Sequence, residues 1–159
     1  MPLGNLTSQF FANVYLNELD YFVKHELKVK YYIRYVDDFV LLHDSKEQLE
    51  KLKIEIDNFL KEKLKLELHP DKSKIIPLSR GIDFVGFRNF AHFRLLRKRN
   101  MRKINRKVHA FRKREKSLHS LQDSYLGWQG YAHMGNTYFF REDIKRKIID
   151  EIWNRIKFE

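Results

Sequence analysis

The chain has 159 residues, of which 43% are hydrophobic, 33% charged and 14% aromatic, and its formal net charge is +11. These values exclude a disordered chain, because enough apolar side chains are present to build a core, and the absence of cysteine excludes disulfides and thiolate metal sites. No apolar run approaches the roughly 18 residues of a membrane span, and the first residues lack a signal-peptide pattern. We therefore expect a soluble, cytoplasmic protein with no membrane partner.

The excess positive charge is confined to residues 94–116, which hold 12 lysines and arginines and one glutamate. The rest of the chain holds 20 basic and 20 acidic residues and is neutral. A dense basic block most often binds a polyanion, and nucleic acid is the commonest one inside cells. The alternative interpretation is a solvated helix face or a charged tail.

The N-terminal third predicts a helix followed by a strand hairpin. Residues 9–27 have apolar side chains at helical spacing, with residues 7–8 as the N-cap. Residues 31–43 are dense in aromatic and β-branched side chains, which favour strands. The two aspartates at 37–38 interrupt this run, so two short strands joined by a tight turn are expected.

The middle of the chain predicts a second helix and then short strands. Ser45 and Gln48 form a capping-box pattern in front of an amphipathic helix. Residues 66–78 contain a His-Pro-Asp turn between two short extended runs. Residues 81–90 are typical of one strand, with which residues 93–96 pair as a hairpin.

The remaining residues predict helices only. Apolar residues at helical spacing between positions 101 and 111 place one buried stripe on the basic segment, which is therefore a docked helix with a cationic face. Further helices are expected over 118–134 and near the C-terminus. The element order indicates an α+β fold, with an α+β unit at 1–93 and a basic helical unit at 94–159.

The most informative polar feature is the pair Asp37 and Asp38, which lies between two apolar strand segments. Buried carboxylates need a compensating partner, and Mg²⁺ suits them because it takes oxygen ligands from one or two carboxylates, water and phosphates. Two-metal phosphoryl transfer uses such a site. The alternative is an ordinary aspartate-rich hairpin turn.

The segment Tyr35-Val36-Asp37-Asp38 resembles the YxDD motif of reverse transcriptases, and three further segments resemble motifs of that family in the same order. These are Pro2-Leu3-Gly4-Asn5-Leu6-Thr7-Ser8-Gln9, Leu66-Glu67-Leu68-His69-Pro70-Asp71-Lys72-Ser73 and Phe84-Val85-Gly86-Phe87. The C-terminal part, with Gly127-Trp128, is similar to the helical thumb of bacterial members. The first segment is most similar to enzymes of diversity-generating retroelements, with group II intron and retron enzymes as near relatives.

The resemblance implies a partial palm (helices packed on an antiparallel sheet with the YxDD hairpin) followed by a helical thumb. It also implies roles for individual residues. Asp37 and Asp38 would bind Mg²⁺, or Mn²⁺ as an alternative, and Lys72 would protonate or neutralise the leaving pyrophosphate. The nucleotide and template would contact Gly4, Ser8 and Gln9, and the primer end would contact Phe84, Val85, Gly86 and Phe87. The nucleic-acid backbone would contact Arg94, Arg97, Lys98, Arg99, Arg102, Lys103, Arg106, Lys107, Arg112, Lys113 and Arg114.

The function implied is an RNA-directed DNA polymerase of the bacterial cytoplasm, with an RNA template, an RNA–DNA hybrid and deoxynucleoside triphosphates as partners. The family also has fingers and a palm aspartate upstream of the first motif, where this chain begins. We therefore expect a fragment that is inactive alone and that pairs with an upstream reverse transcriptase fragment or an accessory protein. The alternative is a non-catalytic module that binds RNA or RNA–DNA hybrids.

Overall fold

The computed structural model describes residues 6–157, which form two compact units that divide between Ile76 and Pro77. Each unit mixes helices with one small antiparallel sheet, so the chain has the expected mixture of helices and antiparallel strands. The division falls earlier than the boundary expected at residue 93 between an α+β unit and a basic helical unit. The reason is that the strands after residue 81 pack against helices of the second unit, where Phe87 and Leu96 share a core with Ala132.

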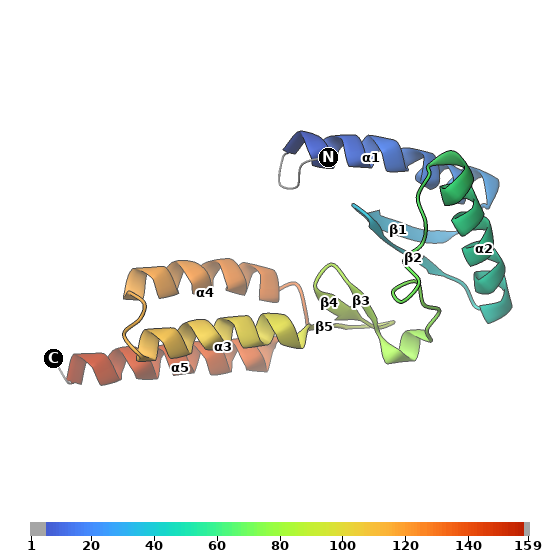
Figure 1. Ribbon diagram of the computed structural model, residues 1–159. Helices are drawn as coiled ribbons and strands as arrows, with labels where there is room; N and C mark the ends of the chain where they lie inside the picture. Colours follow the sequence, from blue (N-terminus) through green and yellow to red (C-terminus); the bar gives the residue numbers. More distant parts are fainter. Residues whose placement is uncertain (1–5, 158–159) are drawn as a thin grey trace. The chain divides into compact units, whose positions relative to one another are not determined.

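The first unit contains two α-helices, a short π-helix and one hairpin (Figure 1). Its elements in chain order are α1 (Leu6–Tyr21), the π-helical η1 (Phe22–Glu26), β1 (Tyr31–Tyr35), β2 (Asp38–Leu42) and α2 (Lys46–Lys63). Strands β1 and β2 are antiparallel, and Tyr35 lies opposite Asp38. Two short strands joined by a tight turn are therefore present, as predicted. The predicted cap of α2 is confirmed, because the Ser45 hydroxyl accepts a hydrogen bond from the Gln48 amide.

The core of the first unit lies between the helices and one face of the hairpin. Leu19 and Val23, from the α1–η1 segment, pack with Leu52, Ile56 and Leu60 of α2. The hairpin side chains that join this core alternate along each strand, as the two-residue period of a strand requires. They are Tyr32, Phe39 and Leu41. The opposite face is uncovered in the described chain, because the side chains of Tyr31, Ile33 and Tyr35 are more than half exposed.

The second unit begins with a short 3₁₀ helix, η2 (Leu78–Arg80), and a three-stranded antiparallel sheet in the order β3 (Ile82–Phe84), β4 (Phe87–Asn89) and β5 (Arg94–Leu96). The prediction of one strand over 81–90 was wrong, because this segment reverses direction at a two-residue turn. The predicted pairing of the next strand with it is confirmed.

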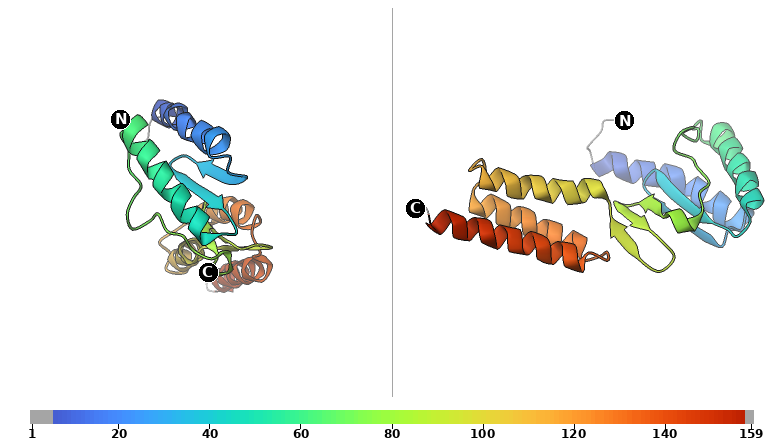
Figure 2. Two further views of the ribbon diagram at one scale, coloured as in Figure 1. Left: turned by 90° about the vertical axis from the view of Figure 1, so that its right-hand side faces the viewer. Right: turned by 90° about the horizontal axis from the view of Figure 1, so that it is seen from below.

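Three helices complete the second unit (Figures 1 and 2). They are α3 (Lys98–Arg112), α4 (Leu118–Ala132) and α5 (Tyr138–Lys157), and α3 packs against both of the others. The predicted apolar stripe of the basic helix is confirmed, because its residues are buried with residues of α4 and α5. The buried cluster consists of Ile104, Val108, Phe111, Leu121, Ile144 and Ile148.

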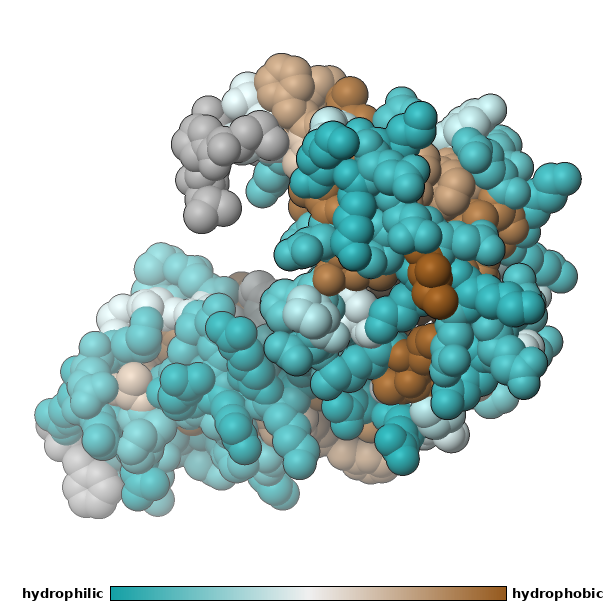
Figure 3. Space-filling view, turned by 45° about the vertical axis from the view of Figure 1, so that its right-hand side comes forward, coloured by the Kyte–Doolittle hydropathy of each residue, from teal (hydrophilic) through white to brown (hydrophobic). Residues whose placement is uncertain are grey.

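The expected cap of α1 was wrong, because the helix begins at Leu6 and residues 7–8 lie inside it. The expected His-Pro-Asp turn is present, since the amides of Lys72 and Ser73 donate to the His69 carbonyl, and the residues between 66 and 77 on either side of it form no regular strand. Hydrophilic side chains dominate the face in Figure 3, with apolar residues in separate patches. Among the described residues, every helix is too short or too polar to cross a lipid bilayer.

Candidate catalytic turn and nucleic-acid groove

The acidic pair lies at the end of the first unit's hairpin. Val36 and Asp37 form the two-residue connection, and Asp38 is the first residue of β2. The side chains of both aspartates are exposed. Asp38 lies opposite Tyr35, whose exposed side chain belongs to the uncovered face of the hairpin. Both carboxylates are therefore accessible to a ligand approaching the turn.

The backbone of this turn is strained at Val36, whose φ is +55°. A β-branched residue in the left-handed region is unusual, and the conformation costs about 1–2 kcal/mol for a residue with a Cβ atom. Such strain persists only where surrounding contacts enforce it, and it is concentrated at functional sites. The strain at Val36 therefore favours a functional role for this turn over chain reversal alone.

Helix α1 contacts the hairpin close to the acidic turn. Arg34 of β1 forms a two-bond ion pair with Asp20, from Nε to Oδ1 at 2.8 Å and from Nη2 to Oδ2 at 2.5 Å. Its Nη1 atom donates to Asn13 Oδ1 at 3.0 Å. Of the residues expected to contact nucleotide or template, Ser8 and Gln9 lie near the start of α1, whereas Gly4 lies outside the described residues. Gln9 is one helical turn before Asn13, so the two share a helix face.

The acidic turn carries two carboxylates, which are ligands that Mg²⁺ prefers in proteins. Two carboxylates without other protein ligands match the way in which proteins bind Mg²⁺, which keeps several waters and also takes substrate phosphates. Within residues 6–157, no three histidine or acidic side chains are grouped closely enough to enclose a metal ion. The turn thus supplies two carboxylates and leaves the other positions around an ion to groups from outside the described residues.

Lys72 lies in the turn that follows α2, where the amides of Lys72 and Ser73 donate to the carbonyl of His69. The Lys53 ammonium holds this segment by donating to the Ser73 carbonyl at 2.6 Å. The side chain of Lys72 is exposed. None of the hydrogen bonds or ion pairs seen in the described chain joins it to Asp37 or Asp38, so the structure does not bring these predicted catalytic residues into contact.

The predicted primer-contacting segment is the β3–β4 turn. Val85 and Gly86 connect the strands with φ values of +46° and +80°, the pattern of a type I′ hairpin turn. The Tyr131 hydroxyl donates to the Val85 carbonyl at 3.2 Å, and Asn100 Nδ2 donates to the Gly86 carbonyl at 3.4 Å. Burial raises the pKa of the Tyr131 hydroxyl, which favours its protonated, hydrogen-bond-donating form.

The side chains around this turn have different exposures. Val85 is exposed, whereas Phe87 is buried and its ring packs against that of Tyr131. Phe84 is half-buried. The turn therefore offers the Val85 side chain to a ligand, while its two carbonyls are bonded to Tyr131 and Asn100 and Phe87 supports it from the core. Sequence reasoning missed Asn100 and Tyr131, which lie 14 and 46 residues from their partners.

A basic groove of about 650 Å³ extends from Gly86 along one face of α3. Its lining contains six cationic side chains and no carboxylate. The cations are Arg97, Arg99, Lys103, Arg106, Lys107 and Lys116. Positions 99, 103 and 106 follow helical spacing, which places them on one face. We call this surface the α3 groove.

The α3 groove separates the predicted backbone-contacting cations into two groups. Five of them line it, as given above, and the others do not. Those outside the groove are Arg94, Lys98, Arg102, Arg112, Lys113 and Arg114. Two of these have structural partners, because the Arg94 guanidinium donates to the Met134 carbonyl and lies over the Phe87 ring, and Arg112 pairs with Glu151 at 3.7 Å.

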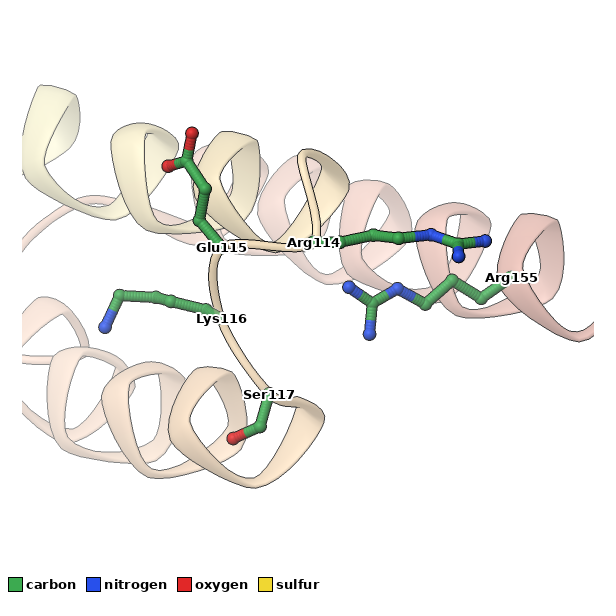
Figure 4. A pocket seen from close by; sticks show the side chains of 5 residues that line it. All are labelled: Arg114, Glu115, Lys116, Ser117 and Arg155. Atoms are coloured by element: carbon green, nitrogen blue, oxygen red, sulfur yellow. The ribbon is translucent and has the colours of Figure 1, made fainter.

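A smaller hollow of about 330 Å³ lies at the α3–α4 connection (Figure 4). Arg114 and Arg155 extend towards each other there, while Glu115 points away from them. Arg155 also stacks on the Phe111 ring at 3.9 Å and donates to the Phe111 carbonyl at 2.8 Å. The positive surface of the second unit thus continues past the end of α3.

A comparison with known protein families identifies the family of the chain. The model of the reverse transcriptase (RNA-dependent DNA polymerase) family matches residues 1–89, which include α1, the acidic hairpin and the β3–β4 turn. The chain belongs to the reverse transcriptase family. The match ends at β4, so the three helices of the second unit lie outside it. No curated protein matches the chain.

Proposed function

We propose that the chain is the palm and thumb part of a bacterial, cytoplasmic RNA-directed DNA polymerase, similar to enzymes of diversity-generating retroelements, group II introns and retrons. The observation that supports this most is the exposed Asp37–Asp38 turn, because it lies within the segment that matches the reverse transcriptase family. The basic groove of the second unit provides independent support, since a polymerase must hold a polyanionic duplex.

At the acidic turn, Asp37 and Asp38 would hold Mg²⁺, or Mn²⁺ in its place. Bound there, the ion supplies charge stabilisation for transfer of a nucleotidyl group to a primer 3′-hydroxyl. The two carboxylates have a positioning role, because they fix the ion at a turn whose backbone is itself fixed. Lys72 would neutralise or protonate the pyrophosphate as the pyrophosphate leaves. For this role the Lys72 side chain must reach the triphosphate, but it does not need to contact Asp37 or Asp38.

Primer and template would contact the remaining sites. The β3–β4 turn, with its exposed Val85 side chain, would position the primer end. Ser8 and Gln9 of α1 would contact the template or the incoming nucleotide, together with Gly4. The α3 groove would bind phosphates of the template–primer duplex. An RNA–DNA hybrid suits this mode, since A-form duplexes are bound mainly by shape and backbone.

Nucleotidyl transfer by two metal ions needs oxygen ligands on both ions. Asp37 and Asp38 belong to a single turn, and Asp38 begins a strand on which neighbouring side chains point to opposite faces. We therefore propose that a further carboxylate comes from another polypeptide segment, such as an upstream reverse transcriptase fragment. The uncovered hairpin face, with exposed Tyr31, Ile33 and Tyr35, offers an apolar surface for that segment.

The experiment that tests this proposal is primer extension on an RNA template with Mg²⁺ or Mn²⁺. The 159-residue chain is assayed alone and in complex with a coexpressed upstream segment that carries fingers and a palm aspartate. We expect extension by the complex only, and none when the complex carries Asp37→Ala. An assembled complex that does not extend primers, or one in which Asp37→Ala extends them normally, would contradict the proposal.

A non-catalytic binding module is the second candidate function. It is favoured by one observation: the α3 groove is formed entirely by residues of the second unit and does not involve the acidic turn. Hybrid binding is common to both functions and cannot separate them. Extension by the chain alone that is lost in Asp37→Ala would exclude this second function and would also show that no further segment is needed.

A further inference from the structure

We propose that Arg34 is a positioning residue that sets the conformation of the acidic turn and thereby the direction of Asp37. This inference rests on the proposed function, because it concerns the same metal-binding turn. Arg34 is the residue before Tyr35, and its side chain is only 10% exposed. Its three guanidinium nitrogens all donate hydrogen bonds, and they connect helix α1 with the turn.

Two of those nitrogens fix the plane of the guanidinium. Nε and Nη2 donate to the two carboxylate oxygens of Asp20 in α1, which is the paired geometry that arginine and carboxylate prefer. The Tyr32 hydroxyl also donates to Asp20 Oδ1, at 2.7 Å. The carboxylate is therefore held from two directions, and the guanidinium has one defined orientation relative to the hairpin.

The third nitrogen acts on the turn itself. Arg34 Nη1 donates to the Val36 carbonyl at 2.8 Å. That carbonyl belongs to the peptide group that links Val36 to Asp37, so the hydrogen bond fixes the plane from which Asp37 extends. Val36 is also the residue at φ +55°, and the bond provides the external contact that such a strained backbone requires.

The same nitrogen links the turn to the nucleotide-facing end of α1. Nη1 donates to Asn13 Oδ1 as well, one helical turn after Gln9. Arg34 thus holds the acidic turn and the face of α1 that would contact template or nucleotide in one arrangement. A lysine could keep the charge opposite Asp20 but has no planar set of donors for both acceptors and the turn carbonyl.

The test measures Mn²⁺ binding to the full chain, through the broadening of the backbone amide NMR signals of Asp37 and Asp38. Residues that orient metal ligands typically change metal affinity by about 10–100-fold. We therefore expect Arg34→Gln and Arg34→Lys each to weaken Mn²⁺ binding at the turn by about tenfold. The matched control is Tyr32→Phe, which removes one bond to Asp20 and leaves the bond to Val36.

The outcomes are distinguishable. Tyr32→Phe is expected to lower the melting temperature while Mn²⁺ affinity stays within about twofold, and Arg34→Lys is expected to remain folded through its ion pair with Asp20. Folded Arg34→Lys with wild-type Mn²⁺ affinity would overturn the positioning role, as would an equal loss of affinity in Tyr32→Phe. If Asp37→Asn leaves the broadening unchanged, the metal site itself is wrong, and the proposed function fails instead.

Discussion

At the scale of single residues, the ion pair between Asp20 and Arg34 governs both stability and site geometry in the first unit. Burial alone would raise the pKa of Asp20, but the hydrogen bonds from Arg34 and Tyr32 and the charge of Arg34 outweigh it, so the pKa is lowered. A lowered folded-state pKa means that the charged carboxylate stabilises the fold above the unfolded pKa of about 3.9. This stability is lost as the pH falls through the folded pKa.

Asp20→Asn should lower the free energy of unfolding by about 2 kcal/mol at neutral pH, because the charged bonds to Arg34 are lost. Urea denaturation followed by circular dichroism measures the difference between variant and wild type. That difference should begin to shrink as the pH falls below about 4, where the carboxylate of the unfolded wild type protonates, and should disappear once the pH is below the lowered pKa of the folded state. Glu50→Gln, which removes an exposed pair with Lys46, serves as the control and should change stability by less than about 0.5 kcal/mol. A pH-independent difference would contradict the assignment.

Gly86 is the second residue at which the structure predicts a clear effect of substitution on stability. A Cβ atom at this position would lie 1.8 Å from the Tyr131 hydroxyl, and the φ of +80° disfavours any side chain. Gly86→Ala should therefore destabilise the protein by about 2–4 kcal/mol. Thermal or urea unfolding measures this loss, and adding Tyr131→Phe should restore part of it.

Gly127→Ala is the matched control, because a Cβ atom there meets open space within helix α4. Alanine is the better helix former, so this variant should be stabilised by about 0.5–1 kcal/mol. Equal stabilities of the two alanine variants would show that the contact between the β3–β4 turn and Tyr131 is not formed.

At the scale of secondary-structure elements, the sequence predicted those elements that depend on residues close together in the chain. It missed those that are held by distant residues. Helices α2 and α3 were predicted because their apolar stripes and the Ser45 cap depend only on residues that are close together in the sequence. The β3–β4 hairpin was missed because Val85 at its first turn position is atypical there. The turn is held by Asn100 and Tyr131, which no local pattern connects to it.

Helix α3 carries cations both inside and outside the α3 groove, so the effect of the groove on binding can be separated from the effect of net charge. The triple variant Arg99→Gln, Lys103→Gln, Arg106→Gln removes three cations of the groove, whereas Lys98→Gln, Arg102→Gln, Lys113→Gln removes three from outside it. Affinity for a labelled RNA–DNA hybrid is measured by fluorescence anisotropy over a range of KCl concentrations.

The groove variant should lose at least about tenfold in affinity, and the slope of log affinity against log salt should flatten by about 2–3. The outside variant should flatten the slope by less than about 1. Both variants change the net charge equally, so equal effects would mean that binding follows overall charge and that the α3 groove is not the binding surface.

At the scale of the whole molecule, the chain consists of two compact units, and the family match extends from the first into the start of the second. The sequence motifs predicted the acidic turn and the basic helix, because each is a short continuous segment, whereas Phe84–Phe87 was expected inside a single strand. The division at Ile76–Pro77 was not predicted, since it depends on Phe87 and Leu96 packing with α4. Arg34 was missed for a similar reason: its role depends on Asp20, 14 residues away in another element.

The central claim is that Asp37 and Asp38 hold a divalent ion at the primer end of a bound hybrid. It is tested most directly by replacing Mg²⁺ with Fe²⁺ and generating hydroxyl radicals with ascorbate and peroxide, using the chain bound to an RNA–DNA hybrid with a labelled primer. We predict cleavage of the primer confined to the nucleotides nearest its 3′ end, and none with the variant Asp37→Asn, Asp38→Asn, which should bind the hybrid equally well. Cleavage that is spread along the hybrid, or that is identical in wild type and variant, would contradict the claim.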